Sequence, residues 1–149
     1  RRPPISTLFP YTTLFRSASL LLCLLPMGIQ AQSQAGPFDV PFKFVAFDSE
    51  FDAGPYHVLR VTESTLRFQN NETGLSRLVV KTQGRDAKTD GRDILVFERI
   101  GALHILREIR SGATGRSSTL PLTKKRSELV QVYISQGFRP EPVLIAASW

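Results

Sequence analysis

Most of the chain beyond residue 36 alternates between apolar and polar positions, which is the period of a strand with one buried face. Phe38, Val40, Phe42 and Phe44 show this alternation first. Pro41 lies among them and cannot donate a backbone hydrogen bond, so we expect an edge strand or a bulge there. Similar patterns predict further strands, for about seven in all, at residues 38–44, 56–61, 65–69, 76–82, 94–100, 102–109 and 143–147.

Two short connections are typical of hairpin turns, because they contain residues that tolerate positive φ. They are residues 70–74 (NNETG) and Gly101. Two longer polar or small-residue segments, residues 83–93 and 111–118, are predicted to be loops.

One helix is expected after Pro121, with Thr123 as its N-cap and its end at Gly137. Leu129, Val132 and Tyr133 would lie on one side of it, although the same region would also suit a strand. The predicted fold is therefore all-β: a single small antiparallel β-sandwich or barrel with one short helix in the C-terminal half.

The first 17 residues have a different character. Residues 7–17, TLFPYTTLFRS, are similar to the translation of a common sequencing adapter, and residues 1–6 differ from its upstream part only at Ile5. This resemblance implies that residues 1–17 are an artefact without meaning for fold or function. They contain three of the 19 basic residues and none of the 13 acidic ones, so the remainder carries +3 rather than +6. The lower charge weakens the case for nucleic-acid binding.

Residues 18–35 resemble a signal peptide that has lost its basic start. The run SASLLLCLLPMGI has the length of a signal-peptide core and is short for a membrane span. Two small-x-small cleavage patterns follow it, at residues 31–33 and 33–35. A buried helix is the alternative, but Pro26 and Gly28 would interrupt it. We expect residues 36–149 to be a single exported domain, periplasmic or secreted.

Cys23 is the only cysteine, and it lies within this leader. A lipid-modified cysteine normally follows small residues, whereas Leu21 and Leu22 precede Cys23, so an ordinary leader residue is the favoured interpretation. The expected mature domain then has no disulfide, thiol nucleophile or cysteine metal ligand.

Four segments of the expected domain form a recognisable set: residues 40–44 (VPFKF), 53–60 (AGPYHVLR), 95–106 (LVFERIGALHIL) and 120–129 (LPLTKKRSEL). Together they resemble small exported proteins of uncharacterised function from Acidobacteria and similar soil bacteria. The chain departs from the group at Asp52, which replaces a proline, and at His104-Ile105, which replace Tyr-Phe. The resemblance implies export and a β fold, and assigns no active site.

No arrangement in the sequence predicts a catalytic, cofactor or metal site. His57 and His104 lie on separate predicted strands, and nothing in their spacing brings them together with Glu108. Asp86, Asp90 and Asp93 lack the order of a calcium loop, and basic residues are interleaved with them. The segment 112–118 (GATGRSS) lacks the Lys-Ser/Thr of a phosphate-binding loop, and we expect a flexible connection.

One basic cluster, Lys124, Lys125 and Arg126, is a candidate contact surface for an envelope protein or an anionic membrane. A solvated helix face is the simpler interpretation. Nucleic acid is not expected as a partner, because no aromatic residues are interleaved with the cluster.

Three classes of function remain. The leading hypothesis is a non-catalytic exported domain that binds or scaffolds at the cell envelope. The second is a carrier of a small apolar ligand, with an interior formed by Phe42, Phe44, Val96, Phe97 and Ile105. The third and least favoured, a hydrolase, needs two reactive side chains to converge among His57, His104, Glu98, Glu108 and Asp93.

Overall fold

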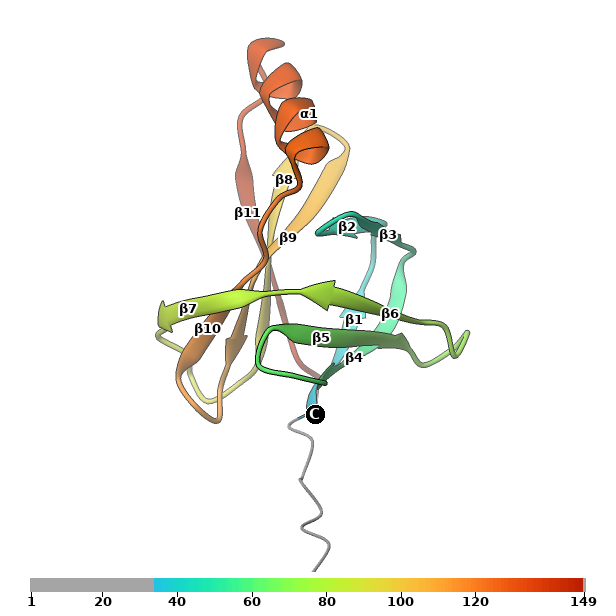
Figure 1. The fold of residues 1–149 in the computed structure, drawn as a ribbon, viewed down its shortest axis with the longest axis vertical. Helices are drawn as coiled ribbons and strands as arrows, with labels where there is room; N and C mark the ends of the chain where they lie inside the picture. The colour runs from blue at the N-terminus through green and yellow to red at the C-terminus, as the bar shows by residue number, and fades with distance from the viewer. Residues whose placement is uncertain (1–33, 149) are drawn as a thin grey trace, which may run out of the picture. The chain divides into compact units, whose positions relative to one another are not determined.

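A computed structural model of the protein describes residues 34–148, which form two β-sheets and one helix (Figure 1). The first sheet has the order β1 (Gln34–Val40), β4 (Gly54–Arg60), β5 (Thr65–Asn70) and β6 (Ser76–Val80), and all of its pairs are antiparallel. The second has the order β11 (Glu141–Ala146), β8 (Ile94–Ile100), β9 (Leu103–Ser111), β10 (Arg116–Thr119) and β7 (Thr82–Asp86). Two short strands, β2 (Phe44–Ala46) and β3 (Ser49–Phe51), join it beside β9. The predicted all-β fold with one helix is confirmed.

The chain changes sheets where the sequence pattern predicted one strand over residues 38–44. Strand β1 ends at Val40 in the first sheet, and β2 begins at Phe44 in the second. Pro41, which has no N–H to donate to a ladder, lies at the break. The single predicted strand is therefore wrong: two strands in different sheets replace it.

Strands β3, β7 and β10 lie in segments that were not predicted to be strands. The sequences of β7 (TQGRD) and β10 (RSST) carry few apolar side chains, and most of their residues are exposed or half-buried. These two strands pair with each other, and β10 also pairs with β9. Backbone hydrogen bonds, rather than an apolar face, hold them in the sheet.

The larger core lies between the sheets and is centred on Phe44. Its ring stacks on Phe51 at 4.9 Å between ring centroids and meets Phe97 edge-on at 5.2 Å. Tyr56 and Phe68 complete the aromatic cluster. Of the residues predicted to form the interior, Phe44, Phe97 and Ile105 are buried, while Phe42 and Val96 are half-buried.

Helix α1 (Lys124–Ser135) follows Thr123, which has the extended backbone of an N-cap although its side chain makes no capping hydrogen bond. Val130 and Tyr133 pack on a smaller cluster that contains Ile100 and Ile105. Val132 is 51% exposed, so the predicted buried side of the helix is wrong at this position. Among residues 34–148, no helix is long and apolar enough to cross a membrane.

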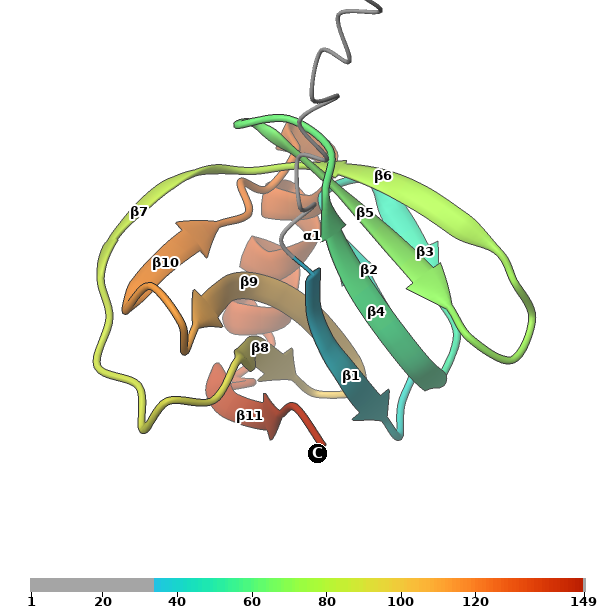
Figure 2. The ribbon, with the colours of Figure 1, turned by 90° about the horizontal axis from the view of Figure 1, so that it is seen from below.

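Strands β6 and β7 are one nearly continuous run that leaves the first sheet and enters the second (Figure 2). Lys81 is the single residue between them. Its N–H donates to the carbonyl oxygen of Ser64 at 2.9 Å, which extends the pairing of β6 with the segment before β5. A strand shared in this way fixes the two sheets against each other on one side of the molecule.

The artefact assigned to residues 1–17, Cys23 and most of the predicted leader lie outside the described residues. The last two residues assigned to the leader, Gln34 and Ala35, belong to β1, where they pair with Leu59 and Val58. Of the two predicted cleavage patterns, the one at residues 31–33 would leave β1 complete.

Candidate functional site: a basic cavity between the sheets

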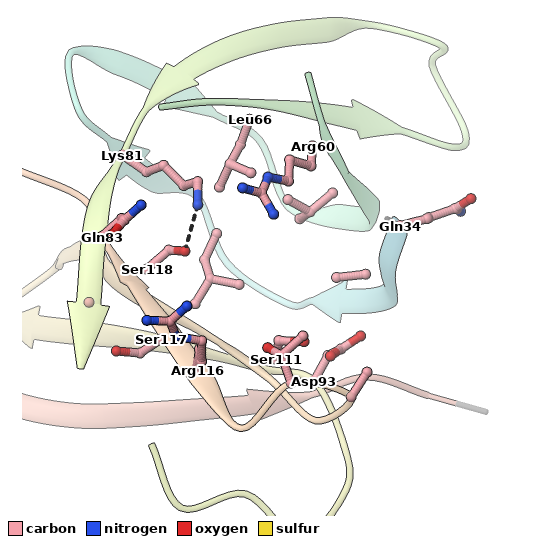
Figure 3. Close-up of a pocket in the computed structure, with 16 residues that line it drawn as sticks. Gln34, Arg60, Leu66, Lys81, Gln83, Asp93, Ser111, Arg116, Ser117 and Ser118 are labelled. Carbon is pink, nitrogen blue, oxygen red and sulfur yellow. Dashed lines mark hydrogen bonds between the residues drawn. The ribbon is translucent and has the colours of Figure 1, made fainter. Parts of the chain in front are cut away.

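A cavity of about 310 Å³ lies between the two sheets, beside the strand that joins them (Figure 3). Strands β1, β4 and β5 supply one wall, and β7, β9 and β10 supply the other. The volume is at the lower end of the range for small-molecule sites. Its lining is Gln34, Ala35, Val58, Arg60, Leu66, Lys81, Gln83, Gly84, Asp93, Ile109, Ser111, Ala113, Thr114, Arg116, Ser117 and Ser118.

The position of the cavity follows from the sizes of the inward-facing side chains. Phenylalanine rings fill the interior around Phe44. The apolar residues that line the cavity are smaller: Ala35, Val58, Leu66, Ile109 and Ala113. These smaller side chains leave space between sheets that the shared strand keeps together.

Lys81 reaches into this space because it continues the inward-facing side of β6. Val79, two residues earlier, is buried, and side chains two apart on a strand share a face. Lys81 itself is only 8% exposed, and its Nζ donates to the Oγ of Ser118 at 3.0 Å. Lysine is rarely this buried without a partner that offsets the loss of water.

Arg60 is exposed at the end of β4, and its side chain points into the cavity (Figure 3). It pairs directly with Leu66 across β4 and β5, and paired residues lie on the same face of a sheet. Leu66 is buried, so Arg60 occupies the core-facing row at the end of β4. Arg116 adds a third basic side chain from β10.

The lining is electropositive. It contains three basic residues, Arg60, Lys81 and Arg116, and one acidic residue, Asp93. In the described part of the chain, none of the four takes part in a salt bridge. The Oδ1 of Asp93 accepts a hydrogen bond from the N–H of Gly112 at 2.8 Å.

The surroundings of Lys81 change its pKa. Burial lowers the pKa of the Lys81 ammonium, and repulsion by the Arg60 guanidinium lowers this pKa further, while Glu63 acts in the opposite direction. Arg60 is exposed, whereas Lys81 is buried and attracts an anion more strongly than it would in bulk water. The arrangement can therefore bind a negative group between Arg60 and Lys81.

The basic cluster singled out from the sequence lies elsewhere, at the start of α1. Lys124 and Lys125 are exposed. The Nη2 of Arg126 is 2.9 Å from the Oε1 of Glu50, which lies in the short strand β3. Arg126 thus anchors the helix to the second sheet, and the cluster stays a prediction as a contact surface.

The side chains considered for metal binding or hydrolysis have separate neighbours. His57 hydrogen-bonds to Gln34, and His104 stacks on Phe42 at 3.9 Å between ring centroids. Burial, followed by the charge of Arg99, lowers the pKa of His104. Glu98 pairs with Arg107 and Glu108 with Arg110. Within residues 34–148, no group of three metal-ligating side chains comes together.

A second hollow lies around β7 and β10 and shares Gln83, Gly84 and Ser117 with the cavity. Its charged residues are of both signs, and Arg110 is occupied by Glu108 at 3.1 Å between Nε and Oε1. Its three basic residues, Arg85, Lys88 and Arg110, face two acidic ones, Asp86 and Glu108, so its excess of positive charge is smaller than that of the cavity.

Sequence reasoning missed the residues of the cavity. Arg60 and Lys81 lie at strand ends without a motif, and residues 116–118 belong to the segment that the sequence predicts to be a flexible connection. The sequence holds no local signal for Lys81, because it alternates with the apolar Leu78 and Val80, which the structure nevertheless exposes.

The chain matches no protein-family model, no curated protein and no solved structure.

Proposed function

We propose that the protein is a non-catalytic binding domain for a small organic anion, which it holds in the cavity between the sheets. The observation that carries the proposal is that Arg60, at the end of β4, and Lys81, between β6 and β7, both reach into one cavity (Figure 3). The predicted leader supports action outside the cytoplasm, in the periplasm or beyond.

The charge of the lining favours an anion over the purely apolar ligand considered from the sequence. An apolar molecule would cover Arg60 and Lys81 without compensating either charge, and burying such charges unpaired is costly. A carboxylate can accept hydrogen bonds from both side chains, and charge-assisted hydrogen bonds are among the strongest in proteins.

The walls favour an organic anion over an inorganic one. Val58, Leu66 and Ile109 are buried residues that line the cavity, and they offer apolar contact to a short carbon chain. Most small-molecule sites combine such walls with a few polar groups that orient the ligand. The expected ligand therefore has a carboxylate head and an apolar body.

Calorimetry with the full chain tests this function. We expect 4-methylpentanoate to bind and its neutral amide to bind far more weakly. Arg60→Gln should raise the dissociation constant of the carboxylate about tenfold or more. This is the loss expected when one charge-assisted hydrogen bond is removed.

Arg67→Gln is the matched control. Arg67 pairs with Leu59 on the outer face of the same sheet, so its loss removes the same charge away from the cavity. If Arg60→Gln and Arg67→Gln bind the carboxylate as the native protein does, or if no carboxylate binds, the proposed function is wrong.

A further inference from the structure

Lys81 differs from the other basic groups of the cavity in its chemistry. An arginine stays charged, whereas a lysine amine that loses its proton is a nucleophile. Lys81 is buried, lines the cavity and has the hydroxyl of Ser118 at 3.0 Å from its Nζ. Desolvation and a neighbouring cation are the two conditions that activate lysine for attack on a carbonyl group.

We propose that Lys81 captures 2-oxo acids in this cavity as a reversible imine, an inference that rests on the proposed anion-binding function. A 2-oxo acid carries its carboxylate on the carbon next to its carbonyl. Arg60 and Lys81 reach the same part of the cavity (Figure 3), so one can bind the carboxylate while the other faces the adjacent carbonyl carbon. Val58, Leu66 and Ile109 then contact an apolar side chain on the acid.

The reaction balances without any further reactant. The neutral Lys81 amine adds to the carbonyl carbon, and one proton moves from nitrogen to the former carbonyl oxygen. The resulting hydroxyl takes up the second proton of the nitrogen and leaves as water while the carbon–nitrogen double bond forms. Water releases the acid again by the reverse steps, so the ligand leaves unchanged.

The environment of Lys81 supports the first step. Burial and the charge of Arg60 lower the pKa of Lys81, which raises the fraction of neutral amine at a given pH. The Ser118 hydroxyl is placed to pass a proton between nitrogen and oxygen, because it already hydrogen-bonds to Nζ.

Reductive trapping tests the inference. The full chain is incubated with 4-methyl-2-oxopentanoate and borohydride, which converts an imine to a stable secondary amine. The mass of the intact protein should rise by the mass of one acid, minus one water and plus two hydrogen atoms. Peptide mapping should locate this adduct at Lys81. Labelling there should be at least about tenfold faster than at exposed lysines, because the bound carboxylate holds the carbonyl beside the amine.

Three controls separate the possible results. Lys81→Arg keeps the charge but lacks the amine, and it should lose the fast adduct. Lys88→Arg, at an exposed position, should keep it. An excess of 4-methylpentanoate, which has no ketone, should protect Lys81 from labelling.

The outcomes also distinguish this inference from the function on which it rests. If 4-methylpentanoate binds but the adduct is absent or spread evenly over exposed lysines, imine capture is wrong and anion binding stands. If neither acid binds, both proposals fail.

Discussion

Gly84 is the residue at which the backbone of β7 comes closest to β10. A Cβ atom placed there would lie 2.3 Å from the Oγ of Ser117 and 2.6 Å from its carbonyl oxygen. The second of these is backbone and cannot rotate away. The close approach brings Ser117 Oγ within 3.0 Å of the carbonyl oxygen of Arg85, to which it donates, and so closes one wall of the cavity.

Gly84→Ala should therefore separate β7 from β10. We expect the free energy of unfolding to fall by about 1–3 kcal/mol, the usual cost of forcing extra atoms into a packed contact. Urea denaturation measures it. Arg85→Ala, at the next and exposed position, should change stability by less than about 0.5 kcal/mol. Equal effects of the two substitutions would contradict a steric role for Gly84.

At the scale of single residues, the sequence predicts burial better than it predicts the site. Phe44 and Phe97 are buried as their alternating pattern indicates. Arg60 and Arg116 look like ordinary surface residues in the sequence. They line a cavity only because segments that are distant in the sequence face each other in the fold. A local pattern of apolar and polar residues contains no information about such tertiary contacts.

Among the elements, α1 depends on an ion pair as well as on its apolar face. Its buried contacts are few, with Val130 as the only helix residue that is fully buried. The hydrogen bond and charge of Arg126 lower the pKa of Glu50. A carboxyl whose pKa is lower in the folded than in the unfolded state stabilises the fold above its unfolded pKa, and the gain disappears as the pH falls through the folded pKa.

Glu50→Gln should consequently melt at a slightly lower temperature than the native protein at neutral pH. The effect should be small, because the Glu50 side chain is 76% exposed. The two melting temperatures should converge in acid, where Glu50 is protonated. Glu128→Gln removes the same charge from the exposed side of α1 and serves as the control in the same melting series. A difference that persists unchanged at low pH would argue against the ion pair.

The strands show why the elements were only partly predictable. Strands with one buried face, such as β5 and β8, were found from their alternating side chains. Strands β7 and β10 are held by backbone pairing to neighbours that are distant in the sequence, and their polar side chains resemble those of loops. Pro41 predicted an edge strand or a bulge, whereas the chain changes sheets there, which depends on tertiary structure.

For the whole molecule, the packing of Phe97 joins the second sheet to the central aromatic cluster. Its ring meets Phe42 and Phe44 edge-on, each at 5.2 Å between centroids. Phe97→Ala should lower the free energy of unfolding by about 3–5 kcal/mol, as expected for a large buried ring. Leu144 in β11 is 56% exposed, so Leu144→Ala should lower the free energy of unfolding far less. Chemical denaturation of both variants checks this, and similar losses would mean that the cluster does not hold the sheets together.

The chain crosses between the sheets three times, through the connections β1–β2, β3–β4 and β6–β7. Neither sheet is therefore a continuous piece of the polypeptide, and neither can detach while the other keeps all of its strands anchored. Slowly exchanging amide protons in the two sheets should consequently share one opening free energy. A molecule held between Arg60 and Lys81 would then slow exchange in both sheets together, including strands that it never touches.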